Sequence, residues 1–129
     1  MRDERGFTLI ELLIVIAIIG IIAGIAAAQM RTAPIKAKEA VLKEDLYALR
    51  DVIDQYFADK GKYPESLDTL VEDAYLRKIP VDPFTNEDST WATVQAETNE
   101  DDPQAAGGIV DVHSGSDGTA IDKSRYSDW

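Results

Sequence analysis

The hydrophobic and polar positions divide the chain into an apolar start and a longer, more polar remainder. Residues 7–28 are almost entirely apolar, and Glu11 is the only charged residue among them. Because roughly 20 apolar residues suffice to cross a bilayer as a helix, this stretch predicts a transmembrane helix. From residue 29 to residue 58 the apolar side chains recur every three or four positions, as on one face of an amphipathic helix: Leu42, Leu46, Leu49, Ile53 and Tyr56 or Phe57.

The two parts predict one long helix that begins at Phe7. We expect it to end near Asp59, because the following Gly61 supplies a C-terminal stop. Glu39 and Lys43 lie four residues apart on this helix, a spacing at which opposite charges attract and stabilise the helix.

Three residues weaken the predicted helix. Pro34 lacks an amide hydrogen and clashes with the preceding turn, so a kink or a break is expected there. Gly20 and Gly24 have the spacing that lets membrane helices approach closely, although all three residues also suit a plain exit from the membrane. We predict local unwinding between Gly20 and Pro34.

The residues after the long helix predict further, shorter elements. Ser66 is placed to cap a short helix that runs to about Asp73. Residues 79–84 contain two prolines and predict an extended stretch. Residues 90–96 alternate between two faces and residues 108–113 are rich in apolar side chains, so they predict two antiparallel strands with one face against the long helix.

Composition limits the kinds of partner. The chain has 129 residues, a formal net charge of −11 and no cysteine, so it is the size of one domain and no disulfide stabilises its small core. Between Lys78 and Lys123 there are ten carboxylates, several of them in the connection 97–107, and no lysine or arginine. A nucleic-acid-binding role is not expected, since phosphate contacts need basic patches. These acids either form a solvated face or bind a hard cation.

The C-terminal residues indicate where such a cation would bind. Residues 113–122 are rich in Ser, Gly and Asp, and calcium takes about six to eight oxygen ligands. We predict that Asp117, with Ser114 or a nearby carbonyl, holds one side of a calcium ion, and that Asp122 or Asp128 closes the other. The alternative is a surface turn in which Asp117 caps its own backbone.

Glu11 is costly inside an apolar helix. A carboxylate near the bilayer centre costs at least ~2–3 kcal/mol, so it marks a function and needs a partner. A cut between Gly6 and Phe7 would create a positive amine one helical turn from Glu11, and the amine of a neighbouring subunit would neutralise the carboxylate. Two simpler interpretations are a plain membrane anchor with an incidental glutamate and a secretory signal, because residues 26–28 form an A-x-A-like cleavage site.

Residues 5–11, Arg-Gly-Phe-Thr-Leu-Ile-Glu, resemble the cleavage motif of type IV pilins and type II secretion pseudopilins. The resemblance implies that a membrane-embedded prepilin peptidase cuts after Gly6. It implies that Phe7 is then N-methylated, and that Glu11 sets the register of subunits during filament assembly.

The same resemblance divides the chain into three parts. Residues 1–6 are the prepilin leader, residues 7–28 the transmembrane and filament-core helix, and residues 29–129 a periplasmic head that includes the amphipathic half of the helix.

Later segments are similar to the major pseudopilins of type II secretion. Residues 63–64 (Tyr-Pro) and 82–84 (Asp-Pro-Phe) resemble two short motifs of that family. Residues 115–118 match the turn of its calcium-binding loop, and Trp129 matches its terminal tryptophan. Arg125 stands at the position of the family's second acidic ligand, which is a departure from the pattern.

Nothing in the sequence predicts an enzyme. His113 is the only histidine, and its neighbours Asp111, Ser114 and Ser116 lie in the same short segment, whereas catalytic triads are assembled from separated segments. Fingerprints for a P-loop, a dinucleotide site or a nucleophile elbow are also missing from the sequence.

Together the patterns predict an α+β fold, in which a long N-terminal helix packs on a small antiparallel sheet and the chain has an ordered C-terminal loop. The resemblance implies a structural subunit of the type II secretion pseudopilus, a periplasmic filament that promotes protein export. Its subunits would each cross the bacterial inner membrane once, and the filament would be assembled from that membrane. Its partners would be further copies of the chain, minor pseudopilins, the prepilin peptidase, an inner-membrane platform protein and an assembly ATPase. The alternative is a type IV pilin of a surface fibre, in which a disulfide that this chain lacks often closes the C-terminal loop.

Overall fold

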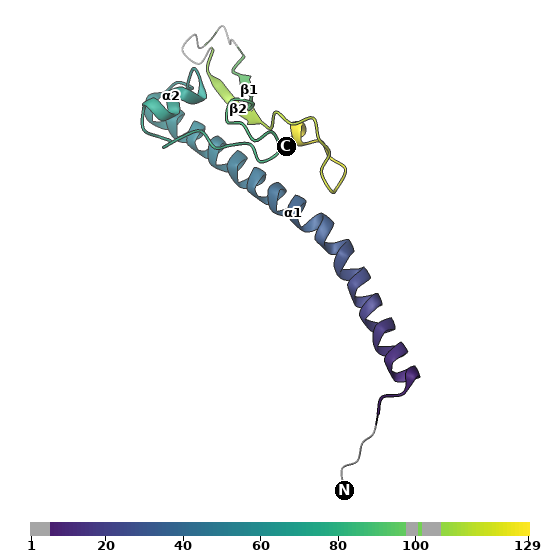
Figure 1. The fold of residues 1–129 in the computed structure, drawn as a ribbon. Helices are drawn as coiled ribbons and strands as arrows, with labels where there is room; N and C mark the ends of the chain where they lie inside the picture. Colours follow the sequence, from purple (N-terminus) through teal and green to yellow (C-terminus); the bar gives the residue numbers. More distant parts are fainter. Residues whose placement is uncertain (1–5, 98–100, 102–106) are drawn as a thin grey trace. The chain divides into compact units, whose positions relative to one another are not determined.

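The computed structural model describes residues 6–97, 101 and 107–129. Most of the predicted leader and most of the acidic connection between residues 97 and 107 therefore lie outside the described residues. The elements follow in the order α1 (Leu9–Lys60), α2 (Leu67–Glu72), β1 (Ala92–Gln95), β2 (Ile109–His113) and a short 3-10 helix at Tyr126–Asp128 (Figure 1). The predicted α+β fold is confirmed.

The chain divides into two compact units, Met1–Ile35 and Lys36–Trp129, and α1 contributes to both. In the first unit α1 begins after Thr8, whose hydroxyl oxygen accepts a hydrogen bond of 3.3 Å from the amide of Glu11. Thr8 thus caps the start of the helix, where backbone amides have no partner inside the helix.

Residues 20–34 are helical, so neither a break at Pro34 nor unwinding from Gly20 to Pro34 occurs in the single chain. A kink, which was the other outcome expected at Pro34, and unwinding on assembly stay predictions. Proline removes one hydrogen bond from a helix interior. Ending the helix at that point and starting a new one would leave about four carbonyl and four amide groups without helical partners. Continuing through the proline is therefore the smaller loss.

The predicted apolar stripe of α1 is confirmed in the second unit, where its five members are buried: Leu42, Leu46, Leu49, Ile53 and Tyr56. Tyr56 is 4% exposed and takes the last position of the stripe, whereas Phe57 is 37% exposed. The predicted stop is also confirmed. Gly61 has a φ of +70° and donates its amide to the carbonyl of Phe57 at 2.8 Å, an arrangement that ends many helices.

The short helix α2 forms as predicted from its cap. The Ser66 hydroxyl oxygen accepts a 3.3 Å hydrogen bond from the amide of Thr69, and the helix places Leu67 and Leu70 in the core. The preceding Pro64 carbonyl accepts the amide of Ile109 at 2.8 Å, which joins this segment to the start of β2.

Strands β1 and β2 pair antiparallel, as predicted, with Thr93 opposite Val112 and an irregularity between Val94 and Gln95. β1 is shorter than the predicted 90–96, and Trp91, which directly precedes it, is buried in the core. Its indole nitrogen donates to the carbonyl of Pro80 at 2.8 Å and so holds the proline-rich stretch in place.

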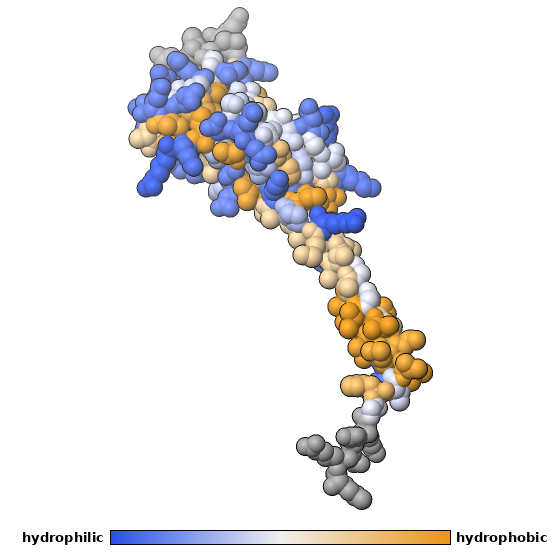
Figure 2. Space-filling model, viewed as in Figure 1, coloured by the Kyte–Doolittle hydropathy of each residue, from blue (hydrophilic) through white to orange (hydrophobic). Residues whose placement is uncertain are grey.

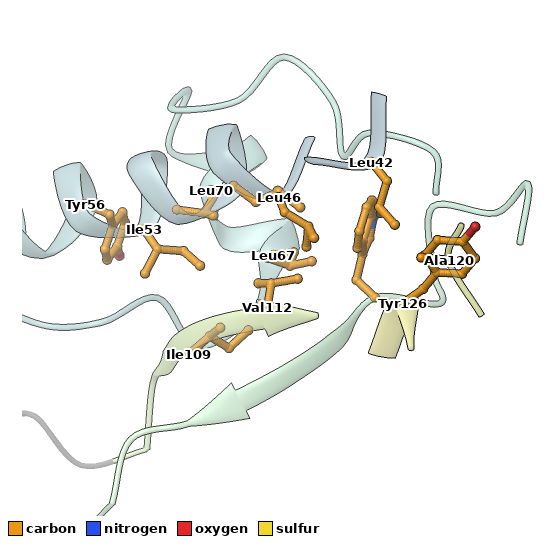
Figure 3. Packing of buried hydrophobic residues seen from close by; sticks show 12 residues of the cluster. Leu42, Leu46, Ile53, Tyr56, Leu67, Leu70, Ile109, Val112, Ala120 and Tyr126 are labelled. Atoms are coloured by element: carbon orange, nitrogen blue, oxygen red, sulfur yellow. The ribbon is translucent and has the colours of Figure 1, made fainter. Parts of the chain in front are cut away.

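The core of the second unit lies between α1, α2 and β2. Figure 3 shows its side chains along α1, from Tyr56 at one end to Leu42 at the other, with Val112 of β2 facing the helix. The buried hydrophobic members are Leu42, Leu46, Leu49, Ile53, Tyr56, Leu67, Leu70, Trp91, Ile109, Val112, Ala120 and Tyr126. Since Ala120 and Tyr126 belong to this cluster, the residues after β2 are part of the packed core.

Candidate functional site

The bond that the sequence predicts to be cleaved lies just before α1. Residues 6–8 are not helical, and Phe7 is 86% exposed. A Cβ atom added to Gly6 would meet nothing within 4 Å, so packing within the described chain does not require a glycine there. The Gly6–Phe7 peptide bond is therefore not covered by the described parts of the chain, and cleavage at this bond stays a prediction.

Glu11 lies in the first turn of α1 and is exposed. The positive end of the helix dipole favours a carboxylate at this position by a few tenths to about 1 kcal/mol. Two ion pairs occur among the described residues, and both involve Asp111 rather than Glu11. Within the described parts of the chain, Glu11 therefore has no cationic partner.

The first part of α1 presents apolar side chains on all sides. Twelve large apolar residues between Leu9 and Ile25 are between 45% and 88% exposed, and Figure 2 shows them gathered over this part of the helix. By length and composition the helix can cross a membrane, and none of its most apolar stretch is buried. A helix that is hydrophobic all round needs an apolar environment.

The structure does not gather the four predicted calcium ligands. Ser114 is buried and its hydroxyl donates to Asp82 at 2.6 Å. Asp122 accepts the amide and the hydroxyl of Ser124, and these hydrogen bonds lower the pKa of its carboxyl. Asp117 and Asp128 are exposed, and the described residues include no group of three His, Cys, Asp or Glu side chains that could hold a metal ion. Calcium binding stays a prediction that this arrangement does not favour.

Asp82 is a completely buried carboxylate, and in the sequence it stands out only as part of the short Asp-Pro-Phe motif. One of its oxygens accepts the amides of Phe84 at 2.9 Å and Thr85 at 3.4 Å, and the other accepts the Ser114 hydroxyl. Asp82 thus joins the proline-rich stretch to the residue that follows β2. A carboxylate next to a proline can close a turn of this kind, but the partner 32 residues away leaves no local signal.

Three charged residues of α1 reach the C-terminal loop, which we define as residues 114–129. Arg50 donates to the backbone oxygen of Trp129 at 2.8 Å, and Glu39 accepts from the amide of Ile121 at 2.8 Å. The predicted contact between Glu39 and Lys43 is not among the ion pairs of the described residues, because the Lys43 ammonium lies over the Trp129 ring, 4.5 Å from its centroid. Helical spacing does not reveal contacts across the fold, so these contacts of Glu39, Lys43 and Arg50 could not be predicted from the sequence.

His113 is also used structurally. Its Nδ1 atom contacts the backbone oxygen of Trp129, and its Nε2 atom lies 3.5 Å from the carboxylate of Asp111. The Ser114 hydroxyl is bonded to Asp82 and not to His113. The residues that suggested a triad by their types therefore hold the end of β2 and the C-terminal loop together.

Comparison with known proteins gives a consistent result. The family model of the prokaryotic N-terminal methylation motif matches residues 1–27. The type II secretion system core protein G of Pseudomonas aeruginosa is 37% identical over 101 residues, which are 66% of this chain and 71% of that protein. The proteins of the same name from Klebsiella pneumoniae and Escherichia coli are 32% and 31% identical over 100 residues, 65% of this chain and 71% and 69% of theirs. No solved structure matches the chain.

Proposed function

The chain belongs to the type II secretion system core protein G family, the major pseudopilins, and on this premise we propose how its residues serve a filament subunit. It is a structural subunit of the pseudopilus, and its family is not a family of enzymes. The names of its relatives favour type II secretion over the alternative of a type IV pilin.

The observation that carries the proposal is the uncovered apolar surface of α1 between Leu9 and Ile25. Covering a dozen large apolar side chains that are about half exposed is worth on the order of 10 kcal/mol, since complete burial of one contributes about 1.5–3 kcal/mol. That sum is comparable with the whole stability of a small domain. The lipid of the membrane covers this surface before assembly, and the same segments of other copies cover it in the filament.

The residues proposed for cleavage and for filament assembly both lie at the start of α1. The prepilin peptidase recognises the accessible Gly6–Phe7 bond and cuts it, and the new amine of Phe7 is methylated and stays positively charged. An amine about 4 Å from the Glu11 carboxylate of a neighbouring copy contributes about 4 kcal/mol at an effective dielectric constant of about 20. That gain offsets the ~2–3 kcal/mol cost of a carboxylate in the membrane.

The same premise gives the surroundings of the subunit. Residues 7–28 cross the bacterial inner membrane once, and the head, residues 29–129, lies in the periplasm. Further copies of the chain and minor pseudopilins form the filament, while a platform protein and an assembly ATPase in the inner membrane drive its growth. Support for this arrangement comes from the family and from the apolar helix near the start of the chain.

The test is a comparison of Glu11→Ala and Glu11→Gln with the parent in cells that overproduce the secretion system. We expect both variants to enter the membrane at normal levels and to lose filaments in electron micrographs of sheared cells, because neither can pair with a neighbour's amine. Glu44→Ala, which removes an exposed acid from the second unit's part of α1, is the matched control and should assemble.

Mass spectrometry of the purified subunit provides the second measurement. The expected chain begins at Phe7 and carries one added methyl group. Filaments of normal yield from Glu11→Ala, or a native chain that still carries residues 1–6, would refute the proposed pairing.

A further inference from the structure

The C-terminal loop, residues 114–129, packs against α1 through charged side chains that no sequence motif assigned. We propose that Glu39 and Arg50 of α1 fasten this loop and that it therefore closes without a bound cation. This inference concerns the fold of the second unit and does not depend on filament assembly.

Glu39 binds two parts of the loop at once. Its Oε1 atom accepts the amide of Ile121 at 2.8 Å and the hydroxyl of Tyr126 at 2.9 Å, across 82 and 87 positions of sequence. Burial, together with the hydrogen bond to Glu39, raises the pKa of Tyr126 to about 12, so the hydroxyl keeps its proton and remains a donor at every physiological pH. Hydrogen bonds to a charged acceptor are among the stronger ones in proteins.

Arg50 fastens the other end of the loop. Its Nε atom lies 2.7 Å from the carboxylate of Asp111, and its Nη2 atom donates to the backbone oxygens of Val112 at 2.9 Å and Trp129 at 2.8 Å. The planar guanidinium thus supplies a fixed positive charge where one carboxylate and two backbone oxygens converge. His113 contacts the same Trp129 oxygen from the strand side.

The loop also satisfies its own polar groups. The amide of Ala120 donates to the carbonyl of Ser124 at 2.7 Å, and the amide of Tyr126 donates to the carbonyl of Gly118 at 3.1 Å. The Trp129 indole donates to the Ser124 hydroxyl at 2.7 Å. Throughout residues 6–97, 101 and 107–129, every buried side-chain nitrogen or oxygen has a hydrogen-bond partner.

Because these contacts already hold the loop, it does not need a bound cation to close. A calcium ion would need about six to eight oxygens around one point. Asp122 is turned back onto Ser124, Ser114 is bonded to Asp82, and the exposed Asp117 is not part of any acidic cluster among the described residues. The residues present fit a loop held by direct hydrogen bonds and an ion pair better than they fit a calcium site.

Hydrogen exchange of the full chain in detergent micelles tests the proposal, with the backbone amides of residues 118–129 as the local probe. The Tyr126 amide is the most informative, because it bonds to Gly118 and does not contact Glu39 directly. We expect Glu39→Ala to speed its exchange about tenfold or more, since losing hydrogen bonds to a charged group costs about 1.5–3 kcal/mol. Glu44→Ala is the matched control on the same helix and should leave the exchange unchanged.

Tyr126→Phe provides a second variant, since it keeps the buried ring and removes only the bond to Glu39. It should speed exchange in the parent and have a smaller effect when Glu39 is already Ala, because the two residues share one interaction.

Measurements with and without calcium test whether the loop closes without a cation. For the parent chain, we expect the same exchange rates and the same unfolding temperature in millimolar calcium and in a chelator. Slower exchange of residues 118–129 in calcium would overturn the proposal, and so would Glu39→Ala rates equal to those of Glu44→Ala. Neither result would affect the test of Glu11, which reports on filament formation.

Discussion

Replacing Asp82 by Ala removes a carboxylate that is 0% exposed and joins two distant segments. In the native chain it accepts the Ser114 hydroxyl at 2.6 Å and the amide of Phe84 at 2.9 Å, with a longer bond of 3.4 Å from Thr85. The substitution leaves the Ser114 hydroxyl and the Phe84 amide without this acceptor. It also frees the Ser114 side chain that accepts the amide of Ser116 in the next turn.

The magnitude follows from those lost partners. An unsatisfied buried donor costs about 1–3 kcal/mol, and Phe84 is near enough to the surface for water to replace part of its bond. We therefore expect Asp82→Ala to lower the free energy of unfolding by about 2–4 kcal/mol. For a unit of this size each kcal/mol shifts Tm by about 4–8 °C, so Tm should fall by about 8–32 °C.

The assay is thermal and chemical denaturation of the full chain in micelles, followed by tryptophan fluorescence. Trp91 reports directly on the segment, because its indole donates to the carbonyl of Pro80. Asp82→Asn should cost about 1 kcal/mol, since an amide oxygen still accepts from Phe84 and the Ser114 hydroxyl can rotate to accept from the amide nitrogen. Asp88→Ala, which removes an exposed acid nearby, is the control and should stay within about 0.5 kcal/mol of the parent.

A double-mutant cycle separates the pair from its surroundings. Ser114→Ala should cost about 1–2 kcal/mol alone and much less when Asp82 is already Ala, because the two side chains share one hydrogen bond. If Asp82→Ala were as stable as Asp88→Ala, or if the two changes were additive, the buried pair would not be what holds these segments together.

Two further predictions concern β2 and the turn that follows it. Gly115→Ala should destabilise the second unit by about 1–3 kcal/mol in thermal unfolding, because the added Cβ would lie 1.9 Å from the carbonyl oxygen of Thr90; an unchanged Tm would contradict this. Burial raises the pKa of the Asp111 carboxyl, but the amide of Val112 and the guanidinium of Arg50 outweigh it and bring the pKa below its usual 3.8. The ionised Asp111 carboxyl therefore stabilises the fold above pH 3.8, and this stabilisation is lost as the pH falls through the lowered pKa. Asp111→Asn should be less stable than the parent at neutral pH and should approach the stability of the parent in acid. A difference in Tm that stays constant with pH would refute this linkage.

Most of the fold could be predicted because its signals are local. The buried stripe from Leu42 to Tyr56 follows from helical periodicity, and the caps at Ser66 and Gly61 depend on residues within one turn of each helix end. The break expected at Pro34 was wrong because a local rule about proline did not weigh the greater number of hydrogen bonds lost by interrupting the helix.

The candidate site divides in the same way. Gly6, Phe7 and Glu11 lie within one short segment, so the resemblance to the prepilin cleavage motif can be recognised from the order and spacing of residues, and the roles that it implies stay predictions. The predicted calcium ligands Asp117 and Asp122 were chosen by type and proximity in sequence, but proximity in a loop does not fix where the carboxylates point.

The sequence alone determined that this chain has a membrane-compatible helix with one acidic residue, an amphipathic continuation and a small antiparallel sheet, because hydrophobic periodicity and capping involve neighbours a few residues apart. Only the tertiary structure decided that Asp82 meets Ser114 and that Glu39 meets Tyr126. These partners are 32 and 87 positions apart, and a polar side chain finds such a partner only where packing of the core has already brought the two segments together.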